Sequence, residues 1–484
     1  MKVYAKLLSF VACACLVRTC EGFLLPSPSL ETCANSASRL RRCSRPLSLS
    51  MQRHAQGMRG DNKRESKGTS GKGSTERLAA KRNREERETG RDPKSKKWGG
   101  QNIFALTSEQ LEQMVKDMGL PAYRARQIYS NLYERGALSY EEMTDLPKSL
   151  RQRLETETVF GSLSVADEQV SRDGTIKRAY ALRDGQLIET VLMPYSDSNR
   201  RTVCISSQAG CAQGCKFCAT GQMGFARQLR PEEIFEQAAR ASAWLRKRGE
   251  RLSNVVFMGM GEPLANYDNV MAAVDRLQAD LGIGARHITI STVGLLDRIR
   301  KLSLENRQVT LAVSLHSVRD RERSAMIPAN QKASVRELLV TCGTYASMTG
   351  RRITFEWALI RGKNDTPAEA ELLAKLLRAH LPRHMCHVNV IPLNPTPGFA
   401  ERETGTEGVR KFLDVLERQG ISATCRVRRG LDISAGCGQL ATELERLKNK
   451  GVPVGVGDMY EDYDLGKIPS REIFQEDISD LSFS

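Results

Sequence analysis

The chain has 484 residues and a formal net charge of +16, a length that allows one large folded domain with appended segments. The charge is uneven, because the first 100 residues hold 22 Lys and Arg against 9 Asp and Glu, whereas residues 101–457 carry a net charge of only about +9. The moderate positive charge of residues 101–457 is compatible with an RNA partner but does not by itself indicate one. Thirteen cysteines, eight of them after residue 50, are too sparse for a disulfide framework and favour a reducing compartment.

Residues 1–22 have the pattern of a cleavable signal peptide, with Lys2 and Lys6 before an apolar run at 7–17 that is too short to span a bilayer. Residues 23–50 are rich in Ser, Pro and Arg, and Glu31 is their only acid, which is typical of a transit peptide. Together the two segments resemble the two-part presequence of algae with secondary plastids. We therefore expect a plastid (chloroplast) location and no membrane span in the mature form. A secreted, mitochondrial or cytoplasmic protein is the alternative.

Residues 51–100 are rich in Gly, Ser, Lys, Arg and Glu, which predicts a disordered basic linker, with a non-specific RNA-binding arm as the alternative. Residues 101–160 predict a small helical accessory domain. Its first helix starts at a capping sequence, 107–110, and Gly119-Leu120-Pro121 ends it. At the other end of the chain, residues 451–484 form an acidic tail.

From residue 161 to 450, and most clearly from about 200, short apolar runs alternate with longer amphipathic ones, which predicts six βα units in a parallel sheet curved into a partial barrel. The expected strands are 202–206, 254–258, 287–291, 309–315, 353–359 and 387–393. Expected helices between them include 231–246, 268–281, 334–345 and 367–377. Active sites of such barrels lie at the carboxyl ends of the strands.

Three cysteines, Cys211, Cys215 and Cys218, follow the first expected strand with spacings of four and three residues. Structural zinc takes four protein ligands, and the nearest further Cys or His is Cys204, seven residues before Cys211 and inside the expected strand rather than in the loop of the triplet. A four-iron cluster can instead use three thiolates and leave one iron open to a small molecule. The triplet therefore favours a [4Fe-4S] cluster over a structural metal knuckle.

Polar residues and glycines follow several of the other expected strands. Each one alone is better explained as a loop-stabilising group, but together, at one barrel rim beside the cysteine triplet, they predict a ligand site. These residues lie in the loop 259–263, at 291–292, at 314–316 and at Asn394.

Two further cysteines are candidates for chemistry. Cys204 lies within the first expected strand, and Cys437 lies between two glycines, which predicts an exposed and mobile thiol. Cys342, Cys386 and Cys425 lie in apolar contexts and are expected to be buried core thiols.

These motifs in this order resemble the radical S-adenosylmethionine (SAM) 23S ribosomal RNA adenine-C2 methyltransferase family, a dual-specificity family for ribosomal and transfer RNA. The resemblance runs from about 103 to 450 and rests on Arg201–Arg227, the loop 259–263, the residues 314–316 and the Cys437 segment. It implies an α/β fold, a partial (βα)6 radical SAM barrel with a small all-α N-terminal accessory domain.

The resemblance also implies a mechanism that uses two SAM molecules per turnover. Cys437 first takes a methyl group, and a second SAM on the cluster is cleaved to a 5′-deoxyadenosyl radical. That radical activates the S-methyl group for addition to adenine C2. Cys204 then releases the methylated base by forming a disulfide with Cys437, and Glu189 matches the proton acceptor. The positions that match the family's SAM-binding residues are Gly261, Glu262, Ser291, Ser314, Leu315, His316 and Asn394. Gly436 departs from the alanine usual before this cysteine, which implies a looser loop.

The expected partners follow from the same resemblance: large-subunit ribosomal RNA, with transfer RNA as a second substrate, and an electron donor such as flavodoxin or ferredoxin, for a monomeric enzyme. Alternatives are methylation at C8 of the same adenosine, or a non-catalytic iron–sulfur RNA-binding protein. Candidates for phosphate contacts, with solvated surface as the alternative for each, are Arg124, Arg126, Arg426, Arg428 and Arg429.

Overall fold

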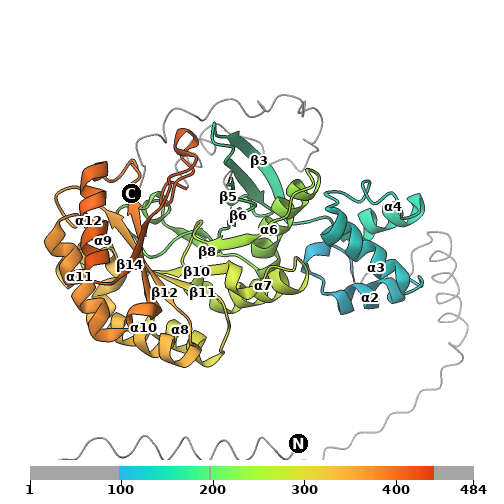
Figure 1. Ribbon diagram of the computed structural model, residues 1–484. Helices are drawn as coiled ribbons and strands as arrows, with labels where there is room; N and C mark the ends of the chain where they lie inside the picture. The colour runs from blue at the N-terminus through green and yellow to red at the C-terminus, as the bar shows by residue number, and fades with distance from the viewer. Residues whose placement is uncertain (1–97, 196–197, 441–484) are drawn as a thin grey trace, which may run out of the picture. The chain divides into compact units, whose positions relative to one another are not determined.

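The computed structural model describes residues 98–195 and 198–440 (Figure 1). The expected presequence, nearly all of the basic linker and the acidic tail lie outside these residues. Within the described part, none of the helices combines the length and the apolar character needed to cross a bilayer.

The first described segment is the expected small helical domain. Thr107 caps its first helix, since its hydroxyl accepts from the backbone N–H of Gln110 while the Gln110 side chain accepts from that of Thr107. The second helix continues into a short π-helix, η3 (Asn131–Arg135). The elements are β1 (Gln101–Asn102), α2 (Ser108–Asp117), α3 (Tyr123–Ser130), α4 (Lys148–Glu157) and β2 (Thr158–Val159), with β1 and β2 paired in parallel.

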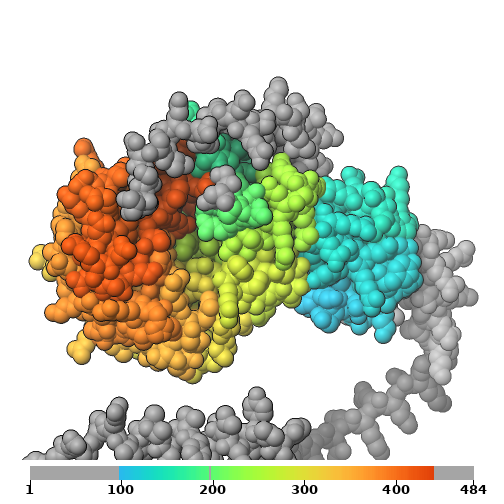
Figure 2. Space-filling model, viewed as in Figure 1, coloured from blue at the N-terminus to red at the C-terminus, as the bar shows by residue number. Residues whose placement is uncertain are grey.

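This domain packs against two helices of the following domain, α6 (Pro231–Arg246) and α7 (Tyr267–Ala279) (Figures 1 and 2). Arg276 on α7 donates to the carbonyl of Phe104 (2.8 Å) and to the hydroxyl of Tyr133 (2.9 Å). The Tyr133 ring also meets the ring of Phe235 on α6, with centroids 5.7 Å apart. The contact therefore combines buried aromatic surface with satisfied polar groups.

The second domain is built on a ten-stranded sheet in the order β14-β13-β12-β11-β10-β9-β6-β5-β4-β3. Strands β6 and β9 to β14 are parallel, whereas β3, β4 and β5 extend the sheet in antiparallel fashion. The strands are β3 (Leu163–Val170), β4 (Ile176–Leu182), β5 (Leu187–Pro194), β6 (Arg201–Cys204), β9 (Asn254–Phe257), β10 (Ile288–Thr292), β11 (Thr310–Ser314), β12 (Ile353–Leu359), β13 (Cys386–Pro392) and β14 (Ser422–Cys425). All six expected strands are confirmed.

Helices follow the parallel strands and cover the outside of the curved sheet (Figure 1). The four expected helices are confirmed; α6 has the expected bounds and the other three differ by a few residues at their ends. Besides α6 and α7, the helices of this domain are α5 (Ala219–Gln222), α8 (Leu296–Leu304), α9 (Asp320–Met326), α10 (Val335–Thr349), α11 (Pro367–His380) and α12 (Thr406–Arg418).

Four strands of this sheet, β3, β4, β5 and β14, were not expected from the sequence. Strand β14 has the polar sequence Ser-Ala-Thr-Cys, and the fully buried β4 contains Lys177 and Arg178, so neither shows a simple apolar run. The position of β14 at the sheet edge also corrects one cysteine assignment. Cys342 and Cys386 are buried as expected, but Cys425 is exposed.

Helix α6 is buried on more than one side, because it lies between the sheet and the helical domain. Its buried polar side chains form hydrogen bonds that hold the neighbouring backbone in place. The Gln237 side chain accepts from the N–H of Ser206 (2.8 Å) and donates to the Ser206 carbonyl (3.0 Å). This pair of bonds holds the chain directly after Cys204, at the carboxyl end of β6.

Candidate active site

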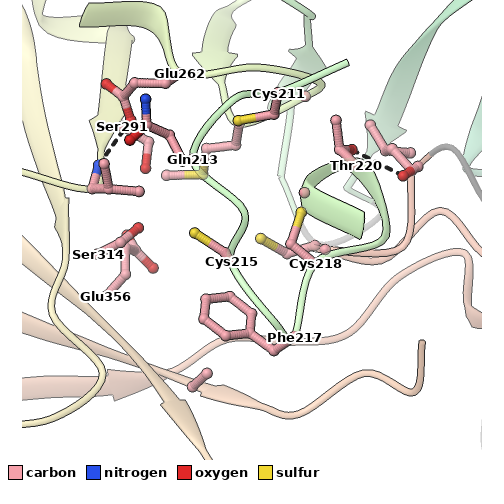
Figure 3. A pocket seen from close by; sticks show the side chains of 18 of the residues that line it. Cys211, Gln213, Cys215, Phe217, Cys218, Thr220, Glu262, Ser291, Ser314 and Glu356 are labelled. Atoms are coloured by element: carbon pink, nitrogen blue, oxygen red, sulfur yellow. Dashed lines mark hydrogen bonds between the residues drawn. The ribbon is translucent and has the colours of Figure 1, made fainter. Parts of the chain in front are cut away.

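A pocket at the carboxyl ends of the parallel strands contains the cysteine triplet. It encloses about 1050 Å³ of space, a volume that includes its open mouth. Figure 3 shows Cys211, Cys215 and Cys218 with their thiols directed into this pocket and the Phe217 ring beside them. The triplet therefore lies where the barrel prediction placed it.

Close backbone packing shapes the cysteine loop. Strands β7 (Gln208–Gly210) and β8 (Phe225–Gln228) pair across its base, and the N–H of Cys211 donates to the carbonyl of Gly224 (2.7 Å). Gly210 has φ +77°, and a Cβ there would lie 2.1 Å from that same carbonyl oxygen. The loop can close in this way only with glycine at this position.

Burial dominates the electrostatics of the triplet. It raises the pKa of Cys211 to about 12 and also raises those of Cys215 and Cys218, because thiolates are poorly solvated there. A bound metal ion instead favours the thiolate form of its cysteine ligands. Among the described residues, no three His, Cys, Asp or Glu side chains meet closely enough to share a single ion. A cluster does not require such a meeting point, since each thiolate binds a different iron.

Most of the rim residues expected from the sequence line this pocket. Leu315 does not: its side chain is fully buried, and its N–H bonds to the carbonyl of Glu356 (3.0 Å). The expected residues that do line the pocket, besides the triplet, are Gly261, Glu262, Ser291, Ser314, His316, Asn394 and Cys437.

Glu262 and His316 have strongly shifted pKa values. Burial raises the pKa of Glu262 to about 7, although its carboxylate accepts from the N–H groups of Val293 (2.9 Å) and Leu264 (3.0 Å). Burial, assisted by Arg323, lowers the pKa of His316 to about 3, so its ring is neutral. His316 Nδ1 accepts from the N–H of Ala358 (2.9 Å), and the ring packs edge-on against Phe217.

The loop bearing Cys437 is fixed to the pocket at both flanks. Asn394 donates to the Cys437 carbonyl (3.0 Å), and the N–H of Ala219, directly after Cys218, donates to the Gly438 carbonyl (2.7 Å). A Cβ on Gly436 would come within 2.7 Å of Gln439 and Asn394. Gly436 therefore permits close packing rather than loosening the loop, which corrects the expectation of a mobile segment.

A hairpin turn between β3 and β4 also holds this loop. Asp432 accepts from the hydroxyl of Ser171 (2.6 Å) and the N–H of Arg172 (3.2 Å), while Asp173 accepts from the N–H of Gly430 (3.0 Å). The antiparallel extension of the sheet thus helps to position Cys437.

Cys204 and Cys437 line a second, adjoining pocket of about 520 Å³. Both thiols are free in this structure. Burial raises the pKa of Cys204 to about 12, and nearby Arg426 opposes the rise for both thiols. Arg426, one of the candidates for a phosphate contact, lines this second pocket, and its charge interacts with both cysteines and with Glu356.

Glu189 is fully buried on β5 and lines neither pocket. Its carboxylate lies 3.9 Å from the ammonium of Lys177, which is also buried. Val191, two residues along the same strand and hence on the same face, does line the second pocket with Cys204. Glu189 is therefore on the thiol side of the sheet but beneath the pocket lining.

Two charged residues of the site were missed from the sequence. Glu356 lies in the buried strand β12 and lines the main pocket, and its place inside an otherwise apolar run is the signal that could have revealed it. Arg323 is fully buried on α9. Its guanidinium donates to the carbonyls of Leu315, Val293 and Ser314 and to the Asn330 side chain, at 2.6–3.0 Å.

We expect Arg323→Met to lower the free energy of unfolding by about 3 kcal/mol, because four buried acceptors would lose charged donors at once. Urea denaturation of the purified protein measures the change. Arg321→Met is the matched control: it lies exposed on the same helix and is expected to cost less than about 0.5 kcal/mol. Equal stability of the two variants would contradict the structural role of Arg323.

Comparisons with known proteins agree with this arrangement. Residues 205–377 match the radical SAM superfamily, and residues 101–159 match the N-terminal domain of ribosomal RNA large subunit methyltransferases. The dual-specificity RNA methyltransferase RlmN 1 of Myxococcus xanthus is 46% identical over 355 residues, 73% of this chain and 97% of that protein. A probable dual-specificity RNA methyltransferase RlmN of Mycolicibacterium vanbaalenii is 49% identical over 68% of this chain and 91% of its own length. The crystal structure of a radical SAM methyltransferase from Sphaerobacter thermophilus matches with a TM-score of 0.67 and 46% identity, covering 71% of this chain and all of that one.

Proposed function

Because the chain belongs to the RlmN family of radical SAM RNA methyltransferases, we propose that it methylates C2 of an adenosine in 23S-type ribosomal RNA, and in transfer RNA as a second substrate. The observation that carries the proposal is the placement of Cys437. It lines both the pocket of the cysteine triplet and the adjoining pocket of Cys204. One thiol can therefore serve both sites.

The residues of the main pocket fit the two groups that the family requires. Three thiols could hold a [4Fe-4S] cluster, and Glu262 would receive a cationic amine. The Oδ1 atom of Asn394 is buried and has no hydrogen-bond partner among the described residues, so it could accept from a bound ligand. When bound, the cluster and SAM would supply a methyl group and a 5′-deoxyadenosyl radical. We propose that two SAM molecules are used per turnover.

Within this scheme, each cysteine outside the triplet has one task. The Cys437 sulfur carries the methyl carbon to the base, and the hydrogen bond from Asn394 to its carbonyl fixes where that sulfur lies. The Cys204 thiolate attacks the Cys437 sulfur, so that a transient disulfide forms as the bond from sulfur to the transferred carbon breaks. That carbon keeps the electron pair of the broken bond and takes up a proton to become the methyl group. Glu189 would accept the proton lost from C2, and its burial beside Lys177 keeps bulk water from it.

Product analysis tests the proposal. Cluster-reconstituted protein, SAM, a reductant and unmodified large-subunit RNA are incubated without oxygen, and the nucleosides are separated by mass spectrometry against standards. We expect 2-methyladenosine. A product of 8-methyladenosine would instead assign the sister activity, whereas an intact cluster that binds SAM without yielding either base or 5′-deoxyadenosine would overturn the enzymatic proposal.

We further propose that the enzyme works as a monomer in a plastid, with a flavodoxin or ferredoxin as electron donor. The plastid proposal rests on the sequence of residues 1–50, which lie outside the described residues. A fluorescent fusion of residues 1–60 that failed to enter plastids would refute it.

A further inference from the structure

The second pocket opens beside a cluster of arginines that the reaction scheme leaves unused. Apolar residues and the two thiols form much of its lining, and Arg428 and Arg429 contribute to it from the segment after β14. Val427, between these arginines and Arg426, is 70% exposed, which is unusual for a β-branched apolar side chain. This edge therefore combines positive charge with an uncovered apolar group.

Tyr195, which follows β5, is contacted by two guanidinium groups. Arg200 lies 3.6 Å and Arg429 4.4 Å from the centroid of its ring. Residues distant in sequence are thus gathered on one aromatic side chain. Arginine groups stacked on a ring keep their hydrogen-bond donors at the edges, available to an anion.

Neighbouring Arg201 explains why Tyr195 and Arg200 are held together. One of its nitrogens donates to the carbonyls of Tyr195 (3.1 Å), Ser198 (3.2 Å) and Arg200 (3.1 Å), and the group pairs with Glu250. The N–H of Tyr195 also bonds to the Arg200 carbonyl (3.1 Å). Arg201 therefore holds the backbone of Tyr195 and Arg200 in place. The Arg200 side chain is exposed, and within the described residues its one interaction is with the Tyr195 ring.

Arg429 forms no ion pair within the described part of the chain, so its charge is not neutralised there. Its Nε is buried and finds no hydrogen-bond partner among residues 98–195 and 198–440. Arg428, in contrast, is paired with Glu403. The two guanidinium groups on Tyr195 are therefore the better candidates for an external anion.

We propose that Tyr195, Arg200 and Arg429 form a binding platform for the RNA backbone at the pocket that holds Cys204 and Cys437. The inference rests on the proposed function and adds to it the residues that receive the phosphates flanking the target nucleotide. The preformed stack suits a single strand, because cations contact phosphates while an aromatic ring and an exposed apolar side chain can meet a base.

Binding measurements with the double variant Arg200→Gln/Arg429→Gln test the platform. Fluorescence anisotropy with an unmodified large-subunit RNA transcript is recorded between about 50 and 200 mM salt. We expect the Kd to rise about tenfold, and the slope of log Kd against log salt to fall by about 1.4, as for two lost phosphate contacts. The KM for RNA should rise together with the Kd, while kcat at saturating RNA should change less.

Two comparisons make the result specific. Arg410→Gln removes an exposed arginine of α12 and should leave both Kd and slope unchanged. Tyr195→Phe should bind RNA as wild type does, whereas Tyr195→Leu should weaken binding, because the ring and not the hydroxyl is needed.

A double variant that binds RNA with the wild-type Kd and slope would overturn the platform, even if the wild-type enzyme methylates RNA as proposed. Conversely, absence of methylation by the wild type would refute the proposed function without altering these binding constants. The two failures are therefore distinguishable.

Discussion

Cys204→Ala is expected to reduce formation of the methylated nucleoside to background and to leave RNA covalently attached to the protein. Cys204 lines the same pocket as Cys437, and no other described cysteine lines that pocket. Without its thiol, nothing breaks the bond between the Cys437 sulfur and the carbon added to the base. Denaturing electrophoresis of the reaction would show a slower protein band that nuclease treatment shifts back.

Cys437→Ala is expected to abolish methylation as well, but without the covalent complex, because the atom that would carry the methyl group is absent. Mass spectrometry of the nuclease-treated Cys204→Ala protein should locate the adduct at Cys437. Cys425→Ala serves as the control, since Cys425 is an exposed thiol on β14 outside both pockets. Wild-type methylation by Cys204→Ala, with no adduct, would refute the role of Cys204.

The second large effect concerns the cysteine triplet. Cys215→Ala is expected to abolish both the visible absorption of the reconstituted cluster and the formation of 5′-deoxyadenosine. Cys215 is buried in the main pocket, and a Cβ on Gly221 would lie 2.9 Å from its backbone nitrogen, so the loop has little freedom to offer a replacement ligand.

The control for this variant is Cys386→Ala, which removes a buried thiol outside both pockets. Its iron content and SAM cleavage should match those of the wild type. Full iron loading of Cys215→Ala, with unchanged 5′-deoxyadenosine formation, would show that the cluster is held elsewhere.

The position of the candidate site could be predicted largely from local sequence. Cys211, Cys215 and Cys218 lie within one short loop, and the rim residues lie at the ends of strands, or a few residues after them, that the apolar runs predict. Most of these residues do line one pocket, because parallel strands deliver their carboxyl ends to the same edge. Leu315 is the exception, since alternation along a strand end turned its side chain into the core.

By itself, the sequence predicted the alternating strands and helices of the barrel, the helical domain and the cysteine triplet after the first strand, because these depend on periodicity and short-range spacing. Only the tertiary structure decided how Cys437 is held, since its anchors Asp432, Asp173 and Asn394 bond to partners up to 261 residues away. It also decided that the charge of Arg426 acts on both thiols and that the ring of Tyr195 contacts Arg200 and Arg429. Interactions between charged residues that are far apart in the sequence become known only from the folded structure. Folding brings these residues within a few ångströms of one another, where the low dielectric constant strengthens their interaction.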